Sequence, residues 1–142
     1  MQKMIFVNLP VTDLAKSTSF YEAIGATRNP QFSDDKVSSM MISDTIVVML
    51  LTHERYKDFT SKTIPDAHKS AQVLLCLSEN SREDVDGRVN SAISGGGKAD
   101  PCPSQDFGFM YGRSFEDPDG HIWEIMWMDP AAVEGGAVEH AA

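Results

Sequence analysis

The strongest constraint on the fold is that one order of predicted elements occurs twice along the chain. In the first half, a short apolar strand precedes a helix that begins at Thr12 or Asp13 and ends at Gly25. In the second half, a strand precedes a helix that is capped by Ser81 and ended by the glycines at 95–97. The predicted strands cover residues 4–9, 36–43, 44–52, 71–78, about 97–102, about 107–115 and about 121–128.

This repeated order predicts an α+β protein built from two tandem βαβββ units. The units are expected at about 2–52 and 70–128, with a period of roughly seventy residues. Residues 53–69 are polar and weakly periodic, so they are interpreted as a connector with one short helix. Residues 129–142 are small and unpatterned, which predicts a disordered tail.

Charge and composition exclude several classes of partner. The chain has 142 residues and a net charge of −9, which disfavours nucleic acid and anionic membranes because both attract basic surfaces. No apolar run reaches the roughly 18 residues of a membrane span, and the first residues lack the pattern of a signal peptide. The two cysteines do not make a secreted disulfide framework. A cytoplasmic protein is therefore expected.

The segment FEDPDGHIWEIMWMD, from Phe115 to Asp129, contains the most informative side chain. A turn rich in Asp, Pro and Gly leads into an apolar strand that one carboxylate, Glu124, interrupts. A carboxylate in such a strand is costly unless it is paired, solvated in a cleft or bound to a metal. Strand alternation places Glu124 on one face with Ile122 and Met126, opposite His121 and the two tryptophans.

Two segments of the sequence resemble motifs of the vicinal oxygen chelate superfamily, which includes glyoxalases, bleomycin-resistance proteins and extradiol dioxygenases. NLPVTDLAKSTSFYEAIGA is similar to the N-terminal motif of that family, and DPDGHIWEIMW is similar to its D-P-D-G-x-x-x-E motif. With the repeat, the resemblance covers about residues 2–128, and it is strongest to small bacterial glyoxalase-like proteins. It implies that the two curved sheets form a cup, within one chain or across a dimer.

The resemblance also implies four positions from which family members hold a divalent metal in the cup. These positions correspond to Phe6, Met49 (or Leu50, if the alignment slips by one residue), Gln72 and Glu124. Phenylalanine cannot ligate a metal, and methionine is a soft ligand that suits copper better than the harder metals of this family. A divalent site normally needs about three good protein donors. No metal site is therefore predicted, and no tightly bound cofactor is expected beyond a weakly held divalent metal.

Alternation places further residues in the predicted cup, which would be mostly apolar with a few polar points. Asn8 shares a face with Phe6, and Cys76 shares a face with Gln72. Glu124 could be a structural carboxylate paired with Arg113, Gln72 could satisfy local backbone, and Cys76 could be a small apolar filler. The predicted ligand-binding residues are Phe6, Asn8, Met49, Gln72, Cys76, Arg113 and Met126, with Glu124 as the candidate catalytic residue.

Four functions remain open from the sequence. The favoured one is a glyoxalase/bleomycin-resistance-like protein that binds a small, partly apolar molecule in a cup with a degenerate metal site. A lactoylglutathione-lyase-like or dioxygenase-like enzyme would use Glu124 as base or ligand and would need a further donor such as His53 or His68. Acid–base catalysis by Glu124 without a metal and a protein-interaction module are the other two. The resemblance also implies a homodimer.

Overall fold

The structure, a computed structural model, describes residues 2–134 and contains both predicted units. The first unit consists of β1 (Ile5–Val11), α1 (Leu14–Ala23), β2 (Thr27–Arg28), β3 (Val37–Met41) and β4 (Ile46–Thr52), with a 3-10 turn η1 (Pro30–Phe32). The second consists of β5 (Leu75–Ser78), α3 (Arg82–Ser94), β6 (Lys98–Ala99), β7 (Gln105–Asp106), β8 (Met110–Glu116) and β9 (Ile122–Met128). The short helix α2 (His53–Tyr56) begins the connector, and α4 (Pro130–Glu134) follows the second unit.

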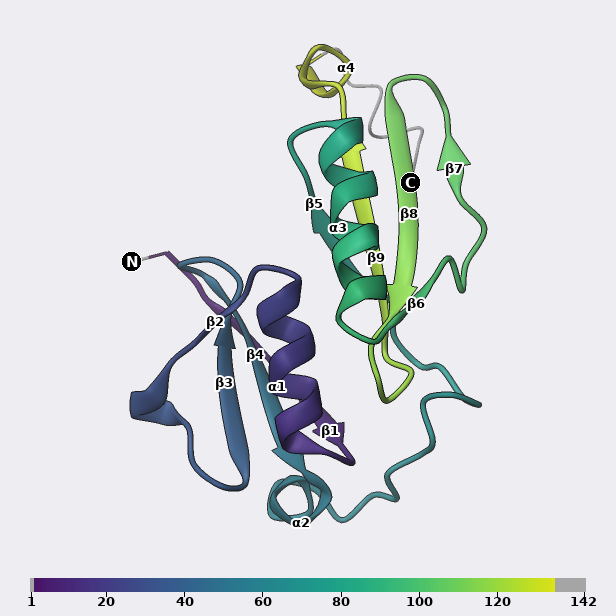
Figure 1. The fold of residues 1–142 in the computed structure, drawn as a ribbon. Coiled ribbons are helices and arrows are strands. Elements are labelled where there is room, and N and C mark those ends of the chain that lie inside the picture. Colours follow the sequence, from purple (N-terminus) through teal and green to yellow (C-terminus); the bar gives the residue numbers. More distant parts are fainter. Residues whose placement is uncertain (1, 135–142) are drawn as a thin grey trace.

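Each unit forms one mixed sheet, as the repeat predicted. The strand orders are β1-β4-β3-β2 and β5-β9-β8-β6, with β7 paired to β8. The β1–β4 and β5–β9 pairs are parallel, and the other neighbours are antiparallel. In Figure 1, α1 lies over the first sheet and α3 over the second, with the two helices side by side between the units. The α+β class and the two-unit architecture are thus confirmed.

Local signals located the helices well. Asp13 caps α1 by accepting a hydrogen bond from the Lys16 backbone N–H, and Ser81 caps α3 through the N–H of Asp84. Gly25 ends the first helix with a φ of 102°, a conformation that favours glycine.

The strand predictions were less accurate. Strand β1 continues through Pro10, which is tolerated because β1 is an edge strand and its outer side has no partner strand. Strand β5 begins only at Leu75, so Gln72 lies before the strand. The two-residue strands β2 and β7 were missed. Helix α4 contradicts the predicted disorder for residues 130–134, and residues 135–142 of that predicted tail lie outside the described residues.

The hydrophobic core is shared by the two units. Phe20 and Tyr21 of α1 are fully buried against Phe115 and Trp123 of the second unit. The Tyr21 hydroxyl donates a hydrogen bond to Asp117 Oδ2 at 2.7 Å and accepts one from Trp123 Nε1 at 3.0 Å. Burial raises the pKa values of both Tyr21 and Asp117. Polar contacts thus tie α1 to the DPDG turn inside an otherwise apolar interface.

We expect Tyr21→Phe to lower the free energy of unfolding by about 1–3 kcal/mol, because it leaves buried Asp117 and Trp123 atoms without their partner. Urea unfolding followed by fluorescence measures the change. Tyr56→Phe is the control: its hydroxyl makes no hydrogen bond among residues 2–134, so stability should change by less than about 0.5 kcal/mol. Equal effects of the two variants would contradict the prediction.

No helix among the described residues is both long enough and apolar enough to cross a membrane.

Candidate functional site

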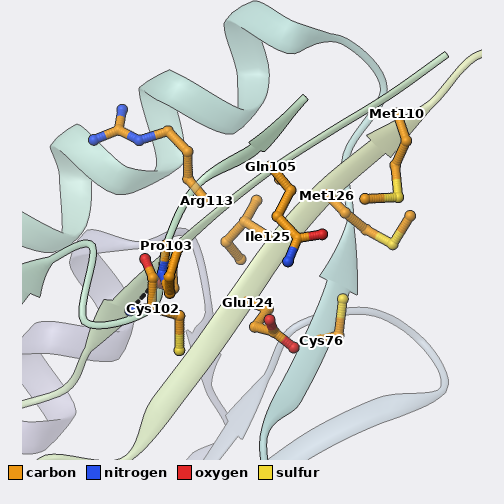
Figure 2. Close-up of a pocket in the computed structure, with 11 residues that line it drawn as sticks. Cys76, Cys102, Pro103, Gln105, Met110, Arg113, Glu124, Ile125 and Met126 are labelled. Carbon is orange, nitrogen blue, oxygen red and sulfur yellow. Dashed lines mark hydrogen bonds between the residues drawn. The ribbon is translucent and has the colours of Figure 1, made fainter. Parts of the chain in front are cut away.

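Glu124 lies in a hollow of about 130 Å³ on the open face of the second sheet. The register of the strands places Cys76 of β5 on one side of it and Ser114 of β8 on the other. Farther along the same face, Met126 lies opposite Gly112, where a Cβ would meet nothing closer than 3.7 Å. The absence of a side chain at Gly112 therefore deepens the hollow. Figure 2 shows Glu124 between Cys76 and Cys102, with Met110 and Met126 farther along the sheet.

The Glu124 carboxylate forms no hydrogen bond or ion pair within the described part of the chain. The predicted alternative partner, Arg113, points away from it toward α3 (Figure 2). Arg113 pairs instead with Asp100 at 2.7 Å and Asp86 at 3.0 Å. These contacts raise the pKa of Arg113 and lower that of Asp100. The pKa of Asp86 is lowered first by a hydrogen bond from the Tyr111 hydroxyl and then by Arg113. The structural interpretation in which Arg113 pairs with Glu124 is therefore wrong, because the guanidinium is already engaged on the opposite face.

Cys76 is a neutral thiol rather than an activated nucleophile. Its partial burial and the neighbouring Glu124 charge both raise its pKa. Both Cys76 and Cys102 are free, and both line the hollow. The sequence interpretation of Cys76 as a small apolar filler is wrong, because its side chain is exposed on the open face of the sheet.

The first unit has a separate hollow on its own open face. Asn8 and Met49 are register partners and both line it, together with Phe32, Arg55 and Phe59 among others. Leu50, the alternative to Met49, is fully buried in the core. Every residue lining this hollow lies between Asn8 and Phe59, whereas every residue around Glu124 lies between Cys76 and Met126.

Consequently one chain does not bring the four family positions together. Phe6 is 56% exposed at the start of β1 and does not line the Glu124 hollow. Gln72 is exposed before β5 and lines a different cavity, with Asn8, Leu75 and Ile122. Gln72 therefore does not meet Glu124, because Gln72 lies before β5 and the residue of β5 that pairs with Glu124 is Cys76.

The three histidines among the described residues occupy a third region. His53 and His68 line a cavity with His121 and Asp119, between the connector and the DPDG turn. His121 Nε2 lies 2.8 Å from the Pro10 carbonyl oxygen, so its ring lies against β1. Neither His53 nor His68 lines the Glu124 hollow. Within one chain, therefore, neither histidine can donate to a metal bound there. Among the described residues, no three His, Cys, Asp or Glu side chains are placed to hold a metal ion.

Sequence reasoning missed some lining residues. Gln105 enters the hollow through the short strand β7, which pairs with β8 and carries too few residues for a periodic signal. Cys102 reaches it because its backbone N–H donates to Ser114 Oγ at 3.0 Å. Both placements depend on contacts across the sheet.

Comparisons with known proteins agree with this geometry. The model of the Glyoxalase/Bleomycin resistance protein/Dioxygenase superfamily matches residues 3–125. A search of the curated proteins found no match. A solved structure of the hypothetical protein SA1046 from S. aureus is 29% identical, with a TM-score of 0.73, covering 89% of this chain and 95% of that one.

Two further solved structures share the fold at lower identity. A glyoxalase/bleomycin resistance protein/dioxygenase family enzyme from Burkholderia phytofirmans PsJN is 20% identical, with a TM-score of 0.72, and the match covers 89% of this chain and 99% of that one. The fosfomycin resistance protein FosX from Listeria monocytogenes is 19% identical, with a TM-score of 0.63, and the match covers 89% of this chain and 91% of that one. Because the family model spans both units and both motifs, this chain belongs to the glyoxalase/bleomycin resistance protein/dioxygenase superfamily.

Proposed function

We propose that this protein binds a small, partly apolar molecule in a cup in which Glu124 is the main polar anchor. The observation that carries the proposal is that the Glu124 carboxylate has no partner among residues 2–134 and lies in a hollow lined by Met110, Met126 and Cys76. A carboxylate without a partner in partly apolar surroundings is unfavourable, and a bound ligand that donates a hydrogen bond to it removes that cost. The free thiols fit a reducing compartment, and we place the protein in the cytoplasm.

The charges around the hollow favour a ligand with a positive charge or a hydrogen-bond donor. The cation nearest the hollow, Arg113, is turned to the opposite face and paired with two aspartates, so it is not available to an anionic ligand. Glu124 contributes a negative charge, and the whole chain carries −9. Electrostatic attraction would thus draw cationic molecules toward this face.

The residues present do not fit the divalent metal that the family implies. Phe6 and Met49 stand where family members place ligands, and neither supplies a hard donor. The described residues also lack a cluster of His, Cys, Asp or Glu that could replace them. For this reason we favour ligand binding over a metal-dependent lyase-like or dioxygenase-like activity.

We further propose that the cup is completed by a second copy of the chain. The hollows around Met49 and Glu124 share no lining residue within one chain, so each unit contributes only half of a cup. Strands β1 and β5 are free sheet edges, and the chain beside them exposes Met4, Ile5, Phe6, Val73 and Leu74. Exposed apolar edges of this kind are suited to pairing with another chain. In the dimer, the first unit of one chain would face the second unit of the other.

Glu124→Gln tests the proposed anchor. A thermal-shift screen of small cationic and neutral aromatic molecules would identify binders of the wild-type protein. We expect the variant to lose at least about tenfold in affinity for cationic binders, because a charge-assisted hydrogen bond contributes about 1.5–3 kcal/mol. Isothermal titration calorimetry measures the loss.

Two controls accompany this experiment. Glu116→Gln removes a carboxylate at the far end of β8, outside the hollow, and should leave affinity unchanged. Elemental analysis of protein purified without chelators should find no stoichiometric divalent metal. Unchanged affinity in Glu124→Gln would contradict the anchor, and about one zinc, nickel, manganese or iron ion per chain would favour the metal-dependent enzyme.

A further inference from the structure

The second sheet has two faces, and the short strand β7 contributes one side chain to each. Gln105 pairs with Gly112 of β8, and its side chain lies on the open face, where it lines the Glu124 hollow. Asp106 pairs with Tyr111, and its side chain lies on the face that α3 covers. Because the two residues are adjacent in one strand, whatever holds Asp106 also fixes where Gln105 lies.

Arg82, the first residue of α3, holds Asp106 through a bidentate ion pair. Its Nη1 and Nη2 atoms donate hydrogen bonds to the two carboxylate oxygens of Asp106, each at 2.9 Å. Nη2 also donates to the carbonyl oxygen of Gly108 at 2.8 Å. The guanidinium carbon lies 5.2 Å from the ring centroids of both Tyr111 and Trp127, so cation–π attraction holds it from two further sides.

This contact is stronger than an ordinary surface ion pair. A single exposed pair usually contributes little to stability, but a bidentate guanidinium–carboxylate contact with further partners is an exception. Hydrogen bonds from Arg82 and then from the Gly108 backbone N–H lower the pKa of Asp106 to about 2, so its carboxylate is ionised at neutral pH. Strand β7 has only two residues, so its own pairing with β8 holds it weakly. The position of β7 therefore depends on Arg82.

On the open face, an empty space above Gly112 separates Gln105 from β9. A Cβ at Gly112 would have two atoms within 4 Å, and neither belongs to Gln105. Figure 2 shows the Gln105 side chain extending across the sheet toward Glu124. The Gln105 amide, like the Glu124 carboxylate, forms no hydrogen bond among residues 2–134. Two polar groups without internal partners thus border one hollow.

We propose that Gln105 is a second polar contact for the ligand that Glu124 anchors, and that Arg82 is the positioning residue that holds Gln105 in place from the opposite face. These roles rest on the proposed function, because they assume a ligand in the hollow. They also select a ligand class. A carboxylate and an amide oxygen both accept hydrogen bonds, so a group that satisfies both must carry several N–H donors. A planar amidinium or guanidinium group has these donors together with the positive charge that suits Glu124.

Isothermal titration calorimetry with benzamidine, a small aromatic amidinium, tests the contact. The wild-type protein should bind benzamidine, and Gln105→Ala should weaken binding about three- to tenfold, the loss expected for one neutral hydrogen bond. Arg82→Gln should also weaken binding, although Arg82 does not line the hollow. In the Gln105→Ala background, Arg82→Gln should cause no further loss, because Arg82 acts through Gln105.

Hydrogen exchange measures the positioning directly and needs no ligand. Arg82→Gln should speed amide exchange in residues 103–109 by about tenfold, because β7 then opens more easily. Exchange in β9 should stay at the wild-type rate, which a general loss of stability would not allow. Lys36→Gln is the matched control, since it removes another cation that pairs with a carboxylate, that of Glu54 at 3.0 Å in the first unit. It should change neither this exchange nor benzamidine binding.

The outcomes separate this inference from the anchor itself. Unchanged affinity in Gln105→Ala, with a loss in Glu124→Gln, would overturn the role of Gln105 and leave the anchor standing. Unchanged affinity in Glu124→Gln would contradict the anchor and with it the second contact. Equal losses from Arg82→Gln in the wild-type and Gln105→Ala backgrounds would overturn the positioning role. A wild-type protein that does not bind benzamidine at millimolar concentration would exclude the amidinium class.

Discussion

Gly97→Ala is expected to lower the free energy of unfolding by about 3 kcal/mol or more, the upper range for overpacking a well-filled site. A Cβ at this position would lie 2.6 Å from Cε1 of Phe20 and closer still to the carbonyl oxygen of Glu116. Phe20 is fully buried in the core shared by the two units, and the Glu116 oxygen belongs to the backbone of β8. Neither group can move without displacing an element that packs against others. Chemical denaturation with urea measures the change.

Gly87→Ala provides the matched control for this prediction. Gly87 lies inside α3, and a Cβ there would meet nothing within 4 Å. Alanine is favoured over glycine in a helix interior by about 1 kcal/mol, so this variant should be slightly more stable than the wild type. The two substitutions make the same chemical change and should have opposite signs. A stability loss below about 1 kcal/mol in Gly97→Ala would show that the close approach is easily relieved.

The second large effect is expected in the oligomeric state. The wild-type protein should be a dimer at micromolar concentration, and the double variant Ile5→Lys with Leu74→Lys should be a monomer. Ile5 is 55% exposed on the free edge of β1, and Leu74 is 52% exposed directly before β5. If these edges pair between chains, the substitutions bury charges in an apolar contact, where each lacks a partner. Sedimentation velocity measures the distribution of masses.

A control with equal added charge separates the edge contact from general electrostatics. Ile93→Lys with Phe107→Lys replaces two residues that are also exposed and apolar but lie on α3 and after β7, away from both edges. This double variant should remain dimeric. A wild-type monomer across the micromolar range would overturn the two-chain cup, as would dissociation of both double variants to the same extent.

Mixed dimers test which residues share a cup. One chain carries Glu124→Gln, and the other carries Met49→Trp, which would fill the first-unit hollow. If each cup contains units from two chains, a mixed dimer holds one cup with neither substitution and regains binding at half its sites. If the cup formed within one chain, each site in the mixture would carry a substitution and binding would stay absent.

Interactions between residues close in the sequence determined the helix ends and the strand faces of this protein. Helix caps and stops are interactions over a few residues, so Asp13, Gly25 and Ser81 could be identified from the sequence alone. Strand alternation is equally local, and it correctly placed Glu124 with Met126 on the open face and Trp123 in the core. The repeated order of these elements then predicted both mixed sheets.

The tertiary structure decided what those local rules leave open. Whether Arg113 or Gln72 meets Glu124 depends on strand ends and on the aspartates of α3 and its neighbours, which are distant in sequence. The role of Gly97 depends on Phe20, far away along the chain, so the sequence showed only a helix end there. The separation of the Met49 and Glu124 hollows has the same origin: a repeat predicts two similar units, but only packing between α1 and α3 fixes where their open faces lie.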